Sequence, residues 1–264
     1  MKKHLKFISL FLILAMGIIA AAGCSPGEDL IVCTAPNFPP FEFPGADGIE
    51  GVDIELANAI AKELGRGVKF EEMEFESIIM SMATDGKGDI AIAGFTITDD
   101  RKESVDFSDP YIKSYQYLIL PEGSEIEFME DLAGKTIGVA LGYTGEFVID
   151  DEIIEGVLEG TNAEMKGYKS AMDATLDIIA GRIDAVVMDE FVAKTIVAQN
   201  NGIETKQLKY KDGGLVEEEY GVVVPKDNAK LLSTVNKVIK RLKDDGQIEK
   251  WLVEYSEKLA SENK

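Results

Sequence analysis

The sequence predicts an α/β protein of two lobes, each built around a mainly parallel sheet flanked by helices, with two crossings of the chain between the lobes. Short apolar strands alternate with amphipathic helices, the alternation starts again after Pro121, and two extended stretches separate the halves. Such alternation is typical of parallel sheets covered by helices. The length suffices for two modest lobes.

The first lobe is expected to follow a β-α-β-α-β order. A helix fits Val52 to Leu64 because apolar residues recur there at helical spacing and Gly65 provides a stop. In chain order the expected elements are a strand over 30–34, a proline-rich turn over 36–40, the helix over 52–64, a strand over 68–72, a helix over 77–84 and a strand over 90–93.

The second lobe repeats this pattern, and the chain then returns. We predict a strand over 136–140, a helix starting over 146–152, a helix over 171–180 and a strand over 183–188. The stretches 115–120 and 219–224 are interpreted as the crossings, and helices over 230–243 and 247–260 then return to lobe one or brace both lobes. The predicted division is a signal at 1–23, a linker at 24–29, lobe one at 30–116 and 219–264, and lobe two at 117–218.

The N-terminus reads as a secretory signal. Met1-Lys2-Lys3 precedes an apolar stretch from Phe7 to Ala22, and Gly23-Cys24 follows. This ending resembles the lipobox of bacterial lipoproteins, in which the cysteine is acylated and becomes the N-terminus. We therefore expect lipidated Cys24 to anchor the protein to the outer face of the cell membrane, in the periplasm if there is a second membrane. The alternative is an uncleaved anchor helix that leaves the domain on the same side.

Composition excludes several kinds of site. The only histidine, His4, lies in the signal, so the mature chain has no histidine triad, and Cys33 alone makes neither an internal disulfide nor a transition-metal cluster. Removing three signal lysines lowers the formal net charge from −21 to −24. So acidic a surface repels nucleic acid and anionic headgroups, so the lipid must supply the membrane attachment.

Five ordered segments carry a family resemblance. They are Phe38–Phe43 followed by Gly51–Ala57, then Ala93–Arg101, Val105–Tyr111, Asp131–Lys135 and Gly142–Glu146. On these segments the chain resembles the bacterial extracellular solute-binding proteins of family 3, the polar amino-acid receptors of ABC importers. The resemblance implies a periplasmic-binding-protein-like fold of type II, a small amino-acid ligand, ABC permease subunits as partners, a monomer, and neither cofactor nor catalysis.

One loop is suited to bind an anion. Residues 94–101 join the carboxyl end of a strand to a helix start, where Thr98 is a plausible N-cap, so free N–H groups and the helix dipole converge. Arg101 adds a planar fork that can hold a carboxylate through two parallel hydrogen bonds. The alternative is a surface pair of Arg101 with Asp99 or Asp100.

The resemblance assigns the poles of the ligand to both lobes. The Gly94 carbonyl and the Thr96 hydroxyl would accept from the ammonium, and the Thr96 N–H and Thr144 would donate to the carboxylate. Asp189 would pair with the ammonium, although it also suits a helix N-cap. Only closure of the lobes would bring Arg101 and Asp189 to the same ligand.

Two aromatic residues are candidates for the side-chain pocket. Phe38 and Phe75 occupy positions where the family places groups that contact the ligand's side chain, and their faces could enclose its stem or stack on a cationic group. Core packing is the alternative role for both.

The end of this pocket departs from many relatives with basic or amide ligands. Ala35 stands where those have an Asp, and Ala140 and Met188, which the resemblance places nearby, are also apolar. This argues against a receptor strictly for basic amino acids, although Asn37 or another acid could compensate.

Two other functions stay open at this point. The first is a dehydratase-like enzyme in the same cleft, which needs a perturbed carboxylate as general base without an ammonium partner. Asp189 is the one good candidate, and it already has a binding role. The second is a sensory or adhesive lipoprotein that has kept the ligand fold.

Overall fold

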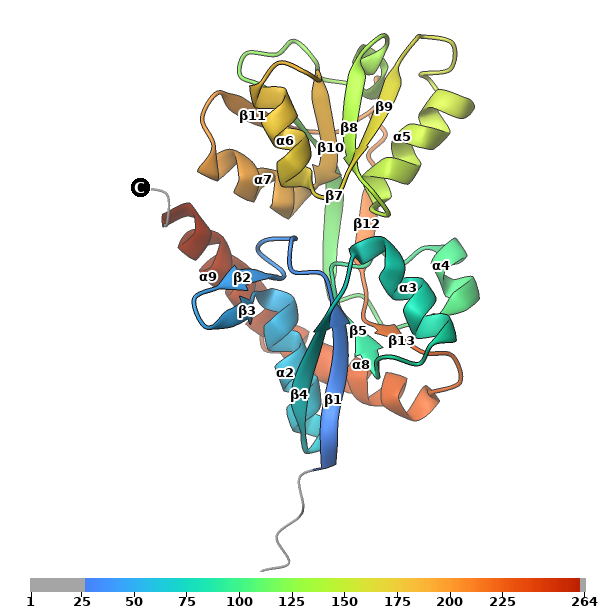
Figure 1. The fold of residues 1–264 in the computed structure, drawn as a ribbon, viewed down its shortest axis with the longest axis vertical. Coiled ribbons are helices and arrows are strands. Elements are labelled where there is room, and N and C mark those ends of the chain that lie inside the picture. Colours follow the sequence, from blue (N-terminus) through green and yellow to red (C-terminus); the bar gives the residue numbers. More distant parts are fainter. Residues whose placement is uncertain (1–26, 262–264) are drawn as a thin grey trace, which may run out of the picture.

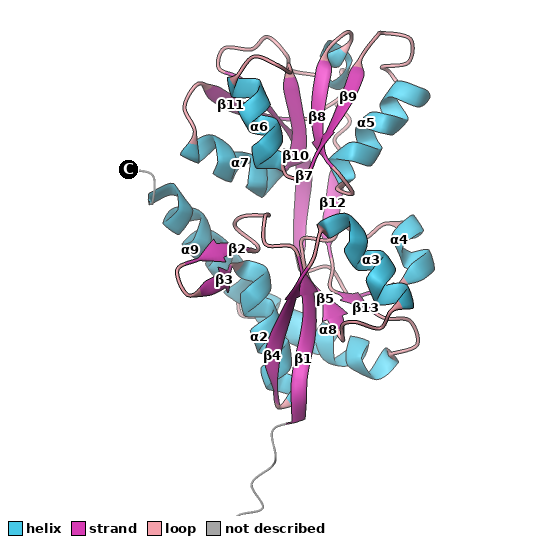
Figure 2. Cartoon of the chain, in the orientation of Figure 1, coloured by secondary structure: helices cyan, strands magenta, loops and turns pink. Residues whose placement is uncertain are grey.

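The computed structural model describes residues 27–261, so the predicted signal and Cys24 lie outside the described residues. Within this range the chain forms two α/β lobes, one above the other in Figures 1 and 2, joined by long strands. The α/β, two-lobed prediction is confirmed.

Lobe one has a five-stranded sheet in the order β4-β1-β5-β13-β6. Its strands are β1 (Gly27–Thr34), β4 (Arg66–Glu72), β5 (Ile90–Ala91), β6 (Asp106–Phe107) and β13 (Val223–Val224). The helices of this part are α2 (Val52–Leu64), α3 (Phe75–Thr84), α4 (Asp99–Ser104) and α8 (Ala229–Asp244), and β2 (Phe43–Gly45) and β3 (Gly48–Glu50) form a hairpin. The helix α2 ends as predicted, because Gly65 adopts the left-handed φ of 67° that a C-cap favours.

Lobe two has a sheet in the order β11-β7-β10-β8-β9, with β12 also paired to β7. The strands are β7 (Ile112–Pro121), β8 (Thr136–Ala140), β9 (Glu164–Tyr168), β10 (Ala185–Asp189), β11 (Ile203–Gln207) and β12 (Glu217–Tyr220). The helices are the 3-10 turn η1 (Met129–Leu132), α5 (Thr144–Ile154), α6 (Ala171–Ile179) and α7 (Glu190–Gln199).

Both sheets are mixed. The βαβ units give the parallel pairs, in which β1 lies beside β4 and β5, and β8 lies beside β9 and β10. Strands next to the crossings run the other way, because β13 is antiparallel to β5 and β6, and β7 is antiparallel to β10, β11 and β12. The antiparallel pairs of both sheets are therefore made by strands next to the crossings.

The hinge consists of β7 and β12. The first half of β7 pairs with β12, from Ile112 opposite Tyr220 to Tyr115 opposite Glu217, and its second half enters the sheet of lobe two. The predicted lobe boundaries fall inside these two strands and stay a prediction. Two paired strands allow the lobes to rotate while the chain between them stays hydrogen-bonded.

The last helix, α9 (Gln247–Ser261), contacts both lobes. On lobe one it packs against α2 and α8, and Tyr255 donates to Glu55 at 3.0 Å. On lobe two it packs against α7, where Gln199 Nε2 donates to the Leu259 carbonyl at 3.3 Å. Of the two alternatives for the C-terminal helices, α9 thus takes the bracing one.

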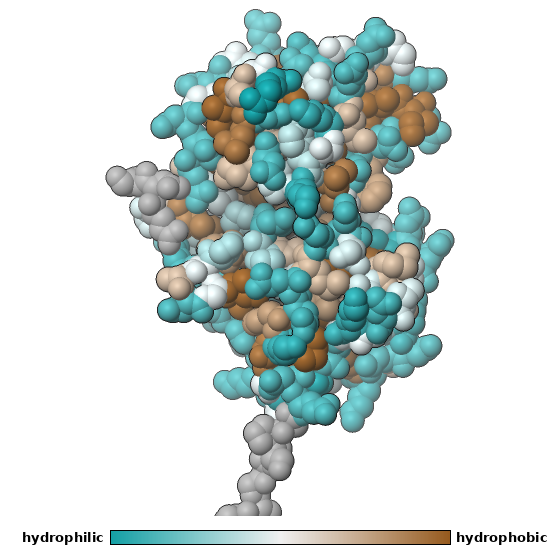
Figure 3. Space-filling view, in the orientation of Figure 1, coloured by the Kyte–Doolittle hydropathy of each residue, from teal (hydrophilic) through white to brown (hydrophobic). Residues whose placement is uncertain are grey.

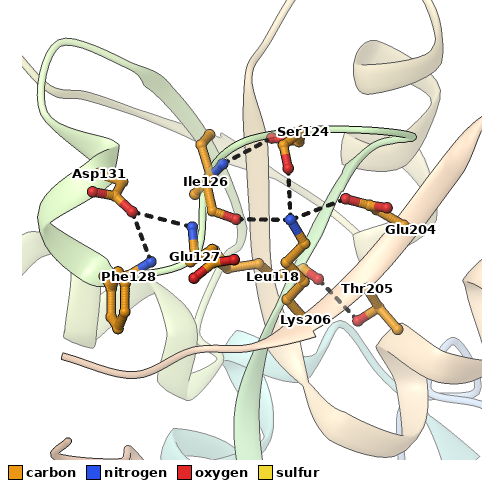
Figure 4. Close-up of polar contacts among 9 residues, drawn as sticks. All are labelled: Leu118, Ser124, Ile126, Glu127, Phe128, Asp131, Glu204, Thr205 and Lys206. Atoms are coloured by element: carbon orange, nitrogen blue, oxygen red, sulfur yellow. Dashed lines mark hydrogen bonds and ion pairs between the residues drawn. The ribbon is translucent and has the colours of Figure 1, made fainter. Parts of the chain in front are cut away.

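A lysine fastens the loop between β7 and η1 to the sheet of lobe two (Figure 4). Lys206 on β11 donates to the carbonyls of Ser124 at 2.6 Å and Ile126 at 3.2 Å and pairs with Glu204 at 3.1 Å. Asp131 accepts from the Phe128 N–H at 3.1 Å and so fixes the start of η1. These contacts hold the far end of lobe two, away from the interlobe cleft.

The surface is mainly polar, with apolar side chains gathered over α5 and α6 (Figure 3). Phe147 and Ile154 on α5 and Leu176 and Ile179 on α6 are exposed. Across residues 27–261, none of the helices combines the length and apolar character that a bilayer crossing requires.

Candidate ligand-binding site

The candidate site lies between the lobes, beside the hinge. Lobe one contributes the loop from Gly94 to Thr98, which pairs with the hinge segment through the Ile97 N–H to the Glu219 carbonyl and the Gly221 N–H to the Phe95 carbonyl, both at 2.9 Å. Lobe two contributes the turn that leads from β8 into α5. Segments more than 100 residues apart thus meet at one place.

Gly94 is required by its surroundings. Its φ of 59° lies in the left-handed region, and a Cβ there would stand 2.4 Å from Phe38 Cε1. Its N–H donates to the buried Asp53 at 2.9 Å, and Tyr111 donates to the other oxygen of Asp53 at 2.8 Å. Burial outweighs these hydrogen bonds and raises the pKa of Asp53 to about 6.

Arg101 points into the cleft, away from Asp99 and Asp100. Its Nη1 donates to the Thr96 carbonyl at 2.8 Å, and its Nη2 donates to the Gly142 carbonyl of lobe two at 2.9 Å. The Asp99 carboxylate pairs with Lys102 instead. The local cap also forms as predicted, since Thr98 Oγ1 accepts from the Arg101 N–H at 3.3 Å. Burial lowers the pKa of Arg101, and Asp189 and Glu218 oppose that shift.

Two threonines connect the lobes. Thr144 at the start of α5 donates to Thr96 Oγ1 at 2.7 Å, and Thr96 Oγ1 donates to Glu218 Oε2 at 2.9 Å. Both hydroxyls therefore lie in the cleft near Arg101 and the buried acids, and their bonds to a ligand stay a prediction.

Asp189 ends β10 and is only 1% exposed. It occupies the N-cap position of α7 but makes no side-chain cap bond. Its carboxylate accepts from Gln116 Nε2 at 2.8 Å and from the Tyr220 hydroxyl at 2.6 Å, both from the hinge strands. Asp189 therefore stands at the N-cap position, as one of the two interpretations predicted, but its side chain makes hydrogen bonds in the cleft instead of capping the helix.

A second buried acid, Glu218, was missed by the sequence interpretation. It is 3% exposed and accepts from the same Gln116 Nε2, at 3.0 Å, that serves Asp189. Burial and the neighbouring Asp189 raise the pKa of Glu218 well above its ordinary range. The signal was the alternation in β7, which buries Ser114 and Gln116 on the same face as Ile112. Polar residues at inward positions of a hinge strand indicate a polar partner across it.

Three aromatic rings form a stack beside these groups. Tyr143 of lobe two lies between Phe38 and Phe75 of lobe one, with ring centroids 5.3 Å and 3.8 Å away and interplanar angles of 16° and 12°. All three rings are buried. The two predicted aromatic residues are thus brought to the cleft, and Tyr143 between them was not predicted.

The apolar residues that the resemblance places at the end of the side-chain pocket lie inside the protein, and their role toward a ligand stays a prediction. Ala35, Ala140 and Met188 are all buried. Asn37 is the polar group nearby, and its Oδ1 accepts from the Tyr143 hydroxyl at 2.9 Å.

A cavity of about 350 Å³ opens beside Arg101. Its lining includes Phe75, Phe95, Arg101, Leu141 and Gly142. None of Thr96, Asp189 and Glu218 lines it, so this cavity adjoins the polar cleft without reaching the buried acids.

The arrangement suits binding of a molecule with two opposite charges. A guanidinium lies on one side, two buried carboxylates lie on the other, and Thr96 connects them by hydrogen bonds. Among residues 27–261, no three His, Cys, Asp or Glu side chains are placed to hold a metal ion.

This chain is similar in sequence and fold to known amino-acid-binding proteins. A probable histidine-binding protein of Neisseria gonorrhoeae is 29% identical over 238 residues, covering 89% of this chain and 86% of that protein. An ancestral arginine-binding protein, solved with arginine, is 38% identical with a TM-score of 0.77, covering 87% of this chain and 98% of that one.

The amino acid ABC transporter substrate-binding protein AbpA of Streptococcus pneumoniae, solved with L-arginine, is 32% identical with a TM-score of 0.79. That match covers 89% of this chain and 96% of the other. Residues 30–258 also match a single protein family over most of the chain. The chain therefore belongs to the bacterial extracellular solute-binding proteins, family 3.

Proposed function

We propose that this protein is the extracytoplasmic receptor subunit of an ABC importer, which closes over one polar L-amino acid and does not transform it. The supporting observation is the cation of Arg101 facing the acids Asp189 and Glu218 across a cleft lined by both lobes. Relatives bind amino acids, and none of those compared above is named as an enzyme. A general base would need a perturbed carboxylate without an ammonium partner, whereas the proposal assigns Asp189 to the ligand's ammonium.

In this proposal the ligand's carboxylate takes the guanidinium fork of Arg101, with help from the Thr96 N–H and Thr144. The ammonium takes the place of Gln116 and Tyr220 as donor to Asp189. It also donates to the Thr96 hydroxyl and the Gly94 carbonyl. Phe38 and Phe75 enclose the side chain. Names of relatives point to histidine or arginine, so a polar side chain is proposed. The apolar Ala35 argues against a requirement for a basic one.

The test is a thermal-shift screen of the mature protein against the proteinogenic amino acids. A ligand that binds only the folded state increases the free energy of unfolding, by about 2.7 kcal/mol when its concentration is 100 times Kd. The melting temperature rises as a result. One or a few polar amino acids should raise it, and the Arg101→Ala variant should lose that shift. No shift with any amino acid would contradict the receptor proposal.

The membrane attachment and the partner belong to the same proposal. Lipidated Cys24 would tether the protein beside its permease, as a monomer. The wild-type protein should incorporate labelled fatty acid and a full-length Cys24→Ser variant should not, while the melting shift with ligand is unchanged. Wild-type protein in the membrane fraction without the label would instead support the uncleaved anchor helix.

A further inference from the structure

The ring of Tyr143 lies in the space between the rings of Phe38 and Phe75, which we call the aromatic slot. It lies nearly parallel to Phe38 and Phe75, and its centroid is only 3.8 Å from that of Phe75. Tyr143 is 3% exposed although it comes from the opposite lobe. Its hydroxyl donates to Asn37 Oδ1 at 2.9 Å, so both the ring and its polar end are satisfied by lobe one.

The preceding residue, Gly142, binds the side chain that is proposed to hold the ligand's carboxylate. The Gly142 carbonyl accepts from Arg101 Nη2 at 2.9 Å, which is the donor that a bound carboxylate would use. Gly142 has a φ of 80°, and a Cβ there would lie 3.0 Å from Glu76 Cβ, so a glycine allows the turn to approach α3 this closely. Glu146 accepts from the Gly142 N–H and holds the turn on its own lobe.

We propose that the Gly142–Tyr143 turn is a built-in competitor for the ligand, and that Tyr143 thereby determines the receptor's affinity. A carbonyl on Arg101 and a flat ring between Phe38 and Phe75 reproduce two of the contacts assigned to the amino acid. The inference rests on the proposed function, because it takes the amino acid to bind in this cleft.

A competitor inside the same chain has a calculable effect. The ligand must displace the turn, so its apparent Kd equals the intrinsic Kd divided by the fraction of molecules with an open slot. If the slot is open in about a tenth of the molecules, the apparent affinity falls about tenfold. Removing the ring should therefore strengthen binding, which is the opposite of what loss of a ligand contact does.

The experiment compares Tyr143→Ala and Tyr143→Phe with the wild-type protein. Calorimetric titration uses the amino acid that gives the largest melting shift, and small-angle scattering measures the radius of gyration without ligand. We expect Tyr143→Ala to bind up to about tenfold more tightly and to open more readily when ligand-free, because the ring that packs lobe two against Phe38 and Phe75 and its hydroxyl bond to Asn37 are lost. Tyr143→Phe, which loses only the hydrogen bond to Asn37, should lie between. The matched control is Tyr210→Phe, which loses a hydroxyl bond to Glu152 within lobe two and should behave as wild type.

Weaker binding by Tyr143→Ala, with an unchanged ligand-free radius, would overturn the inference and make Tyr143 an ordinary ligand contact. The scattering comparison needs no ligand. If no variant binds an amino acid, the receptor proposal fails. If ligand-free wild type and Tyr143→Ala have the same radius of gyration, the inference that Tyr143 competes with the ligand fails.

Discussion

Arg101 is the residue on which the proposed binding depends most. Local sequence explains its position, because Thr98 caps the short helix that carries it and Gly94 turns the preceding loop. Its donors point to two carbonyl oxygens, that of Thr96 in its own lobe and that of Gly142 in lobe two, so both terminal nitrogens are directed at acceptors. A carboxylate offers two such acceptors with a negative charge.

Replacing this arginine tests that role. We expect Arg101→Ala to weaken binding by more than about 100-fold, because two charge-assisted hydrogen bonds of about 1.5–3 kcal/mol each are lost. Arg101→Lys keeps the charge without the fork and should fall in between. Titration calorimetry measures both, and ligand-free melting curves check that the variants fold. Unchanged affinity would remove Arg101 from the site.

The buried acids predict a proton linked to binding. Glu218 and Asp189 share Gln116 Nε2, with Tyr220, Thr96 and Arg101 as the other groups around them. Burial raises the pKa of both acids. Two carboxylates this close favour keeping one proton between them until a cation arrives.

An ammonium ligand lowers the pKa values of Asp189 and Glu218, so binding should release a proton. Affinity should therefore rise with pH, up to the pH at which Glu218 is already ionised in the absence of ligand. Calorimetry in phosphate and in Tris at one pH measures the release through the different ionisation heats of the buffers. Glu218→Gln should abolish it. A buffer-independent binding enthalpy in the wild-type protein would contradict this linkage.

At the scale of elements, α4 is a six-residue helix that positions Arg101 and has no buried residue of its own. So short a helix depends on its cap and on the loop before it rather than on core packing. The sequence pattern Thr-x-x-Arg therefore links the stability of an element directly to the geometry of the cleft.

The cap can be tested by itself. We expect Thr98→Ala to lower the free energy of unfolding by about 1 kcal/mol, because the Arg101 N–H loses its acceptor. Thr98→Ser keeps the hydroxyl and serves as control. Urea unfolding measures both, and ligand affinity should fall with Thr98→Ala, since Arg101 is held less firmly. Equal stability of the two variants would show that the cap contributes nothing.

At the scale of the molecule, acidic charge dominates. The whole chain carries 48 Asp and Glu against 27 Lys and Arg. Most of the ion pairs join half-exposed or exposed side chains, and such pairs are individually worth about 0–1 kcal/mol. We therefore expect the repulsion among unpaired acidic side chains to destabilise the fold more than the attraction within the ion pairs stabilises it. Salt weakens both.

Salt should consequently stabilise the protein. Raising NaCl from about 10 mM to about 150 mM shortens the Debye length from about 30 Å to about 8 Å. A gain of about 1 kcal/mol would raise the melting temperature by about 2–4 °C. Differential scanning fluorimetry measures it, with an uncharged sugar at equal osmolality as the control for solvent exclusion. A falling melting temperature would mean that the ion pairs dominate.

The sequence by itself determined what depends on neighbours along the chain. Alternation predicted the α/β lobes, Gly65 ended α2, and the run from Gly94 to Arg101 marked the loop and capped helix that carry Arg101. These features follow from local backbone geometry, periodic burial and capping, which a few consecutive residues fix. The extended hinge stretches were also visible as such.

Only the tertiary structure decided which distant side chains meet. Gln116 and Glu218 are 102 residues apart and touch because β7 pairs with β12, and Tyr143 reaches Phe38 and Phe75 because the lobes are closed. Strand register and lobe angle set these contacts, and both arise from packing summed over the whole chain rather than from any short segment.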